Sequence, residues 1–196
     1  MNGILVKAYG APPIREKEIL RYAGVKSVDS QTQNLIDTML AEVMELLTYK
    51  VCYTESELVL SGDLCKFVGF EIKSKSLAKN LTGCRRVIIF AATVGIALDR
   101  AIAKYTRLSP ARAFILQAIG AERIESLCDR FEEDLSLELG VKLRPRFSVG
   151  YGDAPLDAQS DIFRILDASR KIGISLNNSM LMSPTKSVSG FIGIEE

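Results

Sequence analysis

A long amphipathic helix between Pro110 and Leu139 is the strongest constraint that the sequence places on the fold. Proline suits the first turn of a helix, and Gly140 stands where a glycine often ends one. Apolar and small residues recur at helical spacing, which predicts one buried stripe: Gly120, Ile124, Leu127, Cys128, Phe131, Leu135 and Leu139. The acidic residues between them are expected to form a mostly solvated face.

The run from Arg86 to Ala92 is apolar after its arginine, which is typical of a strand buried on both faces. Further strands are predicted at 1–9, within 51–72 and at 187–194. Other helices are predicted at 14–23, from a cap at Ser30 to Leu47, at 74–81, from about 95 to 106 and at 155–172, with a loop at 180–186. The sequence therefore predicts an α+β fold, a single domain over 1–196 with helices packed on a twisted, mostly antiparallel sheet.

Composition excludes several classes of function. The chain has 196 residues, of which 47% are hydrophobic and 25% charged, as in a globular protein. A net charge of +1 removes the electrostatic case for nucleic-acid binding. No stretch approaches the roughly twenty apolar residues of a membrane span, and the start lacks the pattern of a secretory signal. We therefore expect a cytoplasmic protein with no nucleic-acid or membrane partner.

The chain contains no histidine. It therefore has no Ser-His-Asp or Cys-His machinery and no imidazole metal ligand. Its four cysteines form no Cys-x-x-Cys pair, so we expect reduced thiols and no metal site. Acid–base chemistry would fall to other groups with shifted pKa values, and no catalytic residue is assigned. This composition favours binding or group transfer by positioning over hydrolysis.

The segment from Arg146 to Asp153, RFSVGYGD, has the residues of a small-molecule cradle. An arginine fork matches a carboxylate or phosphate, and glycine lets the backbone approach a ligand. Tyr151 adds a flat aromatic face, so a flat zwitterionic ligand would suit the segment. The same residues also fit an ordinary turn beside a solvated Arg146, because glycine, aspartate and proline are common in turns.

Two separated motifs resemble those of a known family. Arg146–Tyr151, RFSVGY, resembles the Arg-x-x-x-Gly-Tyr signature of the activation domain of cobalamin-dependent methionine synthase. Ser183–Gly190, SPTKSVSG, resembles that domain's proline-containing loop followed by Ser-Val-Ser-Gly. The order and spacing of the motifs also match, and the similarity is strong over about residues 110–194. The chain looks most like stand-alone members of the superfamily.

The resemblance implies a site for S-adenosylmethionine. In the family, the motif arginine pairs with the methionine carboxylate, and backbone groups of the motif hold the adenosine. On this chain, Arg146 would be the carboxylate clamp and Tyr151 a wall beside the nucleoside. Ser148, Val149 and Gly150 would form the backbone cradle.

The family also places an acid opposite the sulfonium. On this chain Glu125 is the first candidate for that acid, and Glu122 is the alternative. The family's N-terminal aspartate, which contacts the ligand's amino group, has no match in this sequence.

The implied function is that of an accessory component of methionine synthase, a methyltransferase of methionine biosynthesis. Cobalamin occasionally oxidises to an inactive cobalt(II) state, and the activation domain lets it accept an electron and a methyl group from S-adenosylmethionine. The sequence lacks the Asp-x-His-x-x-Gly pattern of cobalamin-binding partners, so cobalamin is expected only through a separate methionine synthase, together with an electron donor. Two alternatives remain: a non-catalytic adaptor or reactivation partner for another corrinoid methyltransferase, and an unrelated domain that matches by chance.

Overall fold

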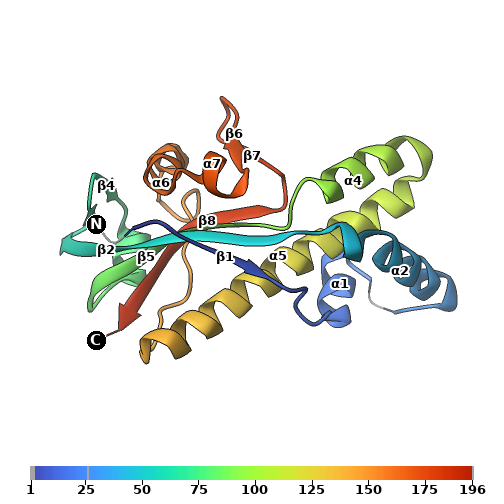
Figure 1. Cartoon of the computed structure of the whole chain (residues 1–196), viewed down its shortest axis with the longest axis horizontal. Helices are drawn as coiled ribbons and strands as arrows, with labels where there is room; N and C mark the ends of the chain where they lie inside the picture. The colour runs from blue at the N-terminus through green and yellow to red at the C-terminus, as the bar shows by residue number, and fades with distance from the viewer. Residues whose placement is uncertain (1–2, 26, 196) are drawn as a thin grey trace.

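The structure, a computed structural model, describes residues 3–25 and 27–195 and is built around an antiparallel sheet (Figure 1). Six strands form this sheet in the order β4-β3-β2-β5-β8, with β1 also paired to β2. The strands are β1 Leu5–Tyr9, β2 Tyr49–Ser61, β3 Leu64–Phe67, β4 Phe70–Lys73, β5 Cys84–Thr93 and β8 Ser187–Glu195. Every pair in it is antiparallel, so the predicted α+β class and sheet type are confirmed.

Helices cover both faces of the sheet. They are α1 Glu16–Tyr22, α2 Ser30–Val43, α3 Lys75–Asn80, α4 Ala97–Leu108, α5 Pro110–Leu139, α6 Gln159–Leu166 and α7 Ala168–Ile172, with 3₁₀ turns η1 Met44–Leu46 and η2 Leu156–Ala158. Helix α5 crosses one face together with α1, α2 and α4, while α6 and α7 lie on the other face (Figure 1). None of the described helices is long and apolar enough to cross a membrane.

The central strand β5 separates two hydrophobic cores. Ile88 and Phe90 pack into the core on the α5 side, whereas Ile89 and Ala91 pack into the core beneath α6 and α7. Because successive side chains of a strand point to opposite faces, a strand covered on both sides must be apolar at every position. This covering of β5 on both faces explains the continuous apolar run in the sequence, Val87–Ala92.

Helix α5 has the predicted limits. Pro110 occupies its first turn, and Gly140 ends it in the left-handed conformation with φ 63°. The buried stripe stops at Leu135, however, because Leu139, which was predicted to belong to it, is 38% exposed. All four cysteines are free and buried, and burial raises the pKa of the Cys52 thiol to about 12.

Some predicted elements differ from the structure. The single helix predicted over 155–172 begins as the 3₁₀ turn η2 and is then broken between α6 and α7, where Asp167 adopts a left-handed conformation with φ 47°. Asp29 caps α2 in place of Ser30, since its carboxylate accepts from the Thr32 N–H at 2.7 Å. The predicted loop at 180–186 contains a short strand.

The short strand within the predicted loop at 180–186 is β7, Met182–Ser183, which pairs with β6, Ser175–Leu176. Most other differences are small shifts in where an element begins or ends. The strand predicted over 1–9 is β1, and the first two residues of that prediction lie outside the described part of the chain.

Candidate functional site

The two sequence motifs lie side by side because the chain before the glycine-rich turn runs antiparallel to β8. The backbone N–H of Phe147 donates to the Phe191 carbonyl at 2.8 Å, and the reverse hydrogen bond has the same length. The N–H of Arg144 donates to the Gly193 carbonyl at 2.8 Å. Backbone pairing at the edge of the sheet therefore sets Arg146–Tyr151 against the strand that begins with the second motif.

Gly190 permits this close approach. A Cβ atom at Gly190 would lie 2.4 Å from the Phe147 carbonyl oxygen and 3.2 Å from Ser148 Oγ. Real Cβ atoms do not come so near to a backbone oxygen, so a larger residue would displace the first motif. The close approach of the two segments therefore explains why Ser-Val-Ser-Gly ends in a glycine.

The segment after Val149 forms a tight turn. Gly150 has φ +86° and donates its N–H to the Ala154 carbonyl at 3.0 Å. Gly152 has φ +59°, and a Cβ there would lie 2.5 Å from Ser76 Oγ. Both positions therefore favour glycine, for conformation and for space.

Asp153 anchors the turn to the start of α3. Its carboxylate accepts from Ser74 Oγ at 2.6 Å, from the Lys75 N–H at 2.8 Å and from the Ser76 N–H at 3.0 Å. These hydrogen bonds, that of the Ser74 hydroxyl first among them, hold the pKa of Asp153 well below its usual value. The turn is therefore fixed at its far end to a helix more than seventy residues away in the sequence.

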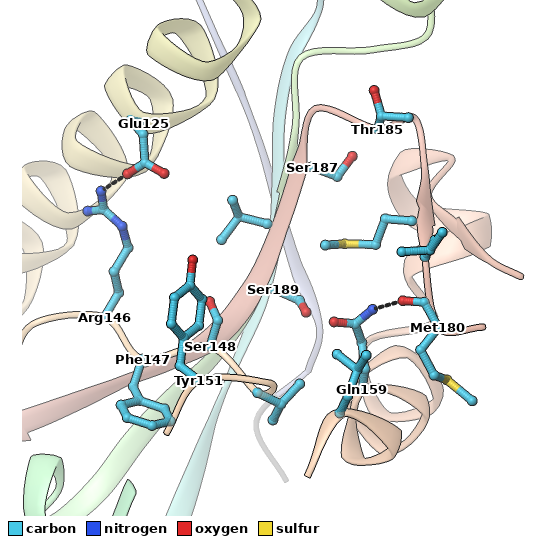
Figure 2. Close-up of a pocket in the computed structure, with 15 residues that line it drawn as sticks. Glu125, Arg146, Phe147, Ser148, Tyr151, Gln159, Met180, Thr185, Ser187 and Ser189 are labelled. Carbon is cyan, nitrogen blue, oxygen red and sulfur yellow. Dashed lines mark hydrogen bonds and ion pairs between the residues drawn. The ribbon is translucent and has the colours of Figure 1, made fainter. Parts of the chain in front are cut away.

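A pocket of about 710 Å³ opens between the two motifs (Figure 2). Pockets of about 300–1,000 Å³ are typical of small-molecule sites. Its walls come from residues 146–149, residues 180–182 and residues 187–189, with Gln159 near the 180–182 wall.

Five of the six predicted binding residues line this pocket: Glu125, Arg146, Ser148, Val149 and Tyr151. Gly150 is not among the lining residues and shapes the turn behind them. Glu122, the alternative acid, is fully buried and paired with Arg123 at 2.5 Å, away from the pocket. The structure thus brings the candidates together, and their roles toward a ligand stay predictions.

Arg146 is held by three carboxylates of α5. Its Nη1 donates to Asp129 Oδ1 at 2.7 Å and to Glu132 Oε1 at 2.6 Å. Its Nη2 donates to Glu125, and Figure 2 shows this bond. The side chain is 23% exposed, so the expectation of a solvated arginine beside a turn is wrong. Burial acts to lower the pKa of Arg146, but the hydrogen bonds to Glu132 and Glu125 and the nearby charges raise it.

The carboxylate of Asp129 also binds Arg15, whose Nη1 donates to Oδ2 at 2.6 Å. This cluster carries one net negative charge, because the guanidiniums of Arg15 and Arg146 face three carboxylates. These carboxylates belong to Glu125, Asp129 and Glu132. Burial raises the pKa of Glu132, and its bond to Arg146 opposes that rise. The cluster can therefore offer a fork to an anionic group and acids to a cationic one.

The sequence analysis missed several residues of the site. Asp129 and Glu132 were assigned to a solvated helix face, although their spacing of four and seven residues from Glu125 places all three on one side of α5. Gln159 and Ser189 also line the pocket. Ser189 lies within the second motif but was given no role, and nothing local in the sequence marks Gln159. In the described part of the chain, no group of three side chains is arranged to hold a metal ion.

Comparisons with known proteins identify relatives of this fold. The family model described as "Vitamin B12 dependent methionine synthase, activation domain" matches residues 77–196. Among solved structures, the MetH reactivation domain bound to AdoHcy is similar with a TM-score of 0.70 and 12% sequence identity, over 97% of this chain and 78% of that chain. At this identity the likeness shows a shared fold. No curated protein matches the sequence.

Proposed function

We propose that this chain, which belongs to the family of vitamin B12-dependent methionine synthase activation domains, binds S-adenosylmethionine and supports reductive methylation of cobalamin on a separate methionine synthase. The observation that carries the proposal is the pocket between Arg146–Tyr151 and Ser187–Gly190. The solved domain with the same fold is bound to AdoHcy, S-adenosylhomocysteine, which is what remains of S-adenosylmethionine after methyl transfer. In this proposal residues 1–196 act as one unit, and cobalamin comes only with the partner.

The residues of the pocket fit a ligand of this kind. The fork of Arg146 matches a carboxylate, and Tyr151 at the pocket mouth offers an aromatic face to a nucleoside. The sulfonium is already an activated methyl donor, so the protein has to supply orientation instead of an acid or base. An electron donor would first reduce the cobalt of the partner's cobalamin, the methyl group would then pass from the sulfonium to that cobalt, and S-adenosylhomocysteine would remain.

The charge of the cluster favours the methylated ligand. S-adenosylmethionine carries a carboxylate, an ammonium and a sulfonium, whereas S-adenosylhomocysteine lacks the sulfonium charge. When the ligand carboxylate takes donors of Arg146, at least one of the acids of α5 loses its partner. In this proposal Glu125 then faces the sulfonium.

Calorimetric titration with S-adenosylmethionine tests binding directly. We expect heat of binding with the wild-type chain and at least about tenfold weaker affinity for Arg146→Lys, because lysine keeps the charge and loses the fork. Arg170→Lys is the matched control, since Arg170 is exposed and pairs with Asp167, the residue that precedes α7, at 3.5 Å. Absence of heat at millimolar ligand would contradict the proposal.

A reactivation assay tests the role in trans. Methionine synthase with oxidised cobalamin is mixed with S-adenosylmethionine, a reductant and this chain, and the visible spectrum of the cobalamin is followed. We expect methylation to depend on the chain and to fall with Arg146→Lys. A spectrum that changes equally without the chain would remove the proposed role.

One observation favours a second function, a non-catalytic adaptor for another corrinoid methyltransferase. The guanidinium of Arg146 is already satisfied by acids of the same chain and needs no ligand to be stable. Recovery of such a methyltransferase in a pull-down, together with no heat from S-adenosylmethionine, would favour the adaptor.

A further inference from the structure

We propose that Ser189 and Gln159 form a polar subsite that recognises the amino edge of the ligand's purine base. This inference rests on the proposed binding of S-adenosylmethionine and extends it by assigning specificity to two side chains. Both residues line the pocket, on the side away from Arg146 (Figure 2).

Ser189 has a buried hydroxyl that lacks a partner. The residue is 2% exposed, and its Oγ makes no hydrogen bond with any residue in the described ranges. Ser187, two residues earlier on the same strand, lies 2.8 Å from the Pro184 carbonyl and 2.9 Å from Thr93 Oγ1. An unpaired buried hydroxyl costs free energy, so its place in a pocket wall indicates that a ligand completes it.

Gln159 has a carboxamide of fixed orientation. The residue is 4% exposed, and its Nε2 donates to the Met180 carbonyl at 2.7 Å. Because a carbonyl oxygen only accepts hydrogen bonds, the carboxamide must turn Nε2 toward Met180, and Oε1 then points away from Met180. Figure 2 shows this oxygen pointing toward Ser189 across the pocket.

The two groups together select a chemical pattern. Gln159 Oε1 accepts a hydrogen bond, and the free hydroxyl of Ser189 can donate one. The edge of a 6-aminopurine offers the complement, an amino donor beside a ring-nitrogen acceptor. Neither side chain is charged, so this end of the pocket does not suit a carboxylate or phosphate. Met182 and Leu156, which also line the pocket, suit a flat ring.

A 6-oxo purine would be a poor ligand for the same reason. Its carbonyl places an acceptor where the amino group stood, so Gln159 Oε1 loses its donor and faces a second acceptor, whereas the Ser189 hydroxyl can turn and accept from the adjacent N–H. Sites built to hydrogen-bond a polar group reject analogues that leave their buried groups unpaired.

Calorimetry with S-adenosylmethionine and its 6-oxo analogue S-inosylmethionine tests the inference. We expect the wild-type chain to prefer the adenosyl ligand by at least about tenfold. Ser189→Ala should weaken the adenosyl ligand about fivefold or more, because the ring nitrogen loses its donor. Its melting temperature should not fall, because the substitution removes a hydroxyl without a partner.

Ser169→Ala, on α7 and outside the pocket lining, is the control. It removes a hydroxyl that donates to the Ile174 carbonyl at 2.9 Å, so we expect a lower melting temperature and an unchanged affinity for both ligands. If wild type binds both ligands equally, or Ser189→Ala leaves the affinity for the adenosyl ligand unchanged, the subsite is overturned while the proposed function stands. If wild type binds neither ligand, both proposals fail.

Discussion

The guanidinium of Arg146 donates a hydrogen bond of 2.7 Å to the carboxylate of Asp129, on the long helix that crosses the sheet. The other oxygen of this carboxylate accepts from Arg15 at 2.6 Å, at the start of α1. Through one side chain, the N-terminal segment and the pocket share an ion-pair network. The backbone N–H of Arg15 extends the network to Glu122, at 3.2 Å.

Asp129→Asn is expected to reduce the preference for S-adenosylmethionine over S-adenosylhomocysteine. The substitution removes the net negative charge of the cluster, and the two ligands differ by one positive charge. A unit charge about 8 Å away contributes about 1 kcal/mol at an effective dielectric near 40, a factor of about five in the ratio of dissociation constants. Titration of both ligands measures that ratio.

The control is Asp134→Asn, on the same helix, where the carboxylate pairs with Arg130 at 3.0 Å. It should leave the ratio as in wild type. An Asp129→Asn protein with an unchanged ratio would show that cluster charge does not discriminate between the ligands.

Arg146→Ala should destabilise the fold by about 2 kcal/mol at pH 7, less than for a fully buried pair because the group is partly exposed. The loss should shrink as the pH falls. A carboxyl whose pKa is raised in the folded state penalises folding when ionised, and that penalty vanishes below its ordinary pKa of 4.5. Burial already raises the pKa of Glu132, and loss of the arginine raises it further.

Urea unfolding of wild type and Arg146→Ala at pH 7 and pH 5 measures this effect. The difference in unfolding free energy should be smaller at pH 5. A difference in unfolding free energy that grows on acidification would show that the loss of stability does not come from ionised carboxylates left without Arg146.

Gly190→Ala should lower stability by about 1–3 kcal/mol, as overpacking does. The added Cβ would lie 2.4 Å from the Phe147 carbonyl and push the first motif away from β8. Affinity for S-adenosylmethionine should fall as well, because the two walls of the pocket separate. Gly10→Ala is the control, since no atom lies within 4 Å of a Cβ there.

Asp153→Asn should lower the melting temperature at neutral pH, because one of the oxygens that accept hydrogen bonds at the start of α3 becomes an amide nitrogen. The pKa of Asp153 is lowered in the fold, so its contribution is present above the ordinary value of 3.8 and is lost as the pH falls below it. Thermal unfolding of wild type and variant should therefore converge under acidic conditions. The exposed Asp157→Asn serves as control, and a constant gap would refute the role of the charge.

The sequence alone predicted the features that depend on neighbouring residues. Proline and glycine set the ends of α5, because they restrict or free the backbone at their own positions. The apolar run of β5 predicted a strand covered on both faces, and the family assignment from two motifs agrees with the family model. The sequence also predicted five of the residues that line the pocket.

Only the tertiary structure decided what surrounds those residues. Asp129 and Glu132, which hold Arg146 together with Glu125, could not be told from a solvated face, because exposure depends on which segment packs against α5. The pairing of Gln159 with Met180 arises where two separate segments meet. Backbone preferences act over a few residues, whereas charge pairing and burial depend on contacts between distant parts of the chain, and the latter shape this pocket.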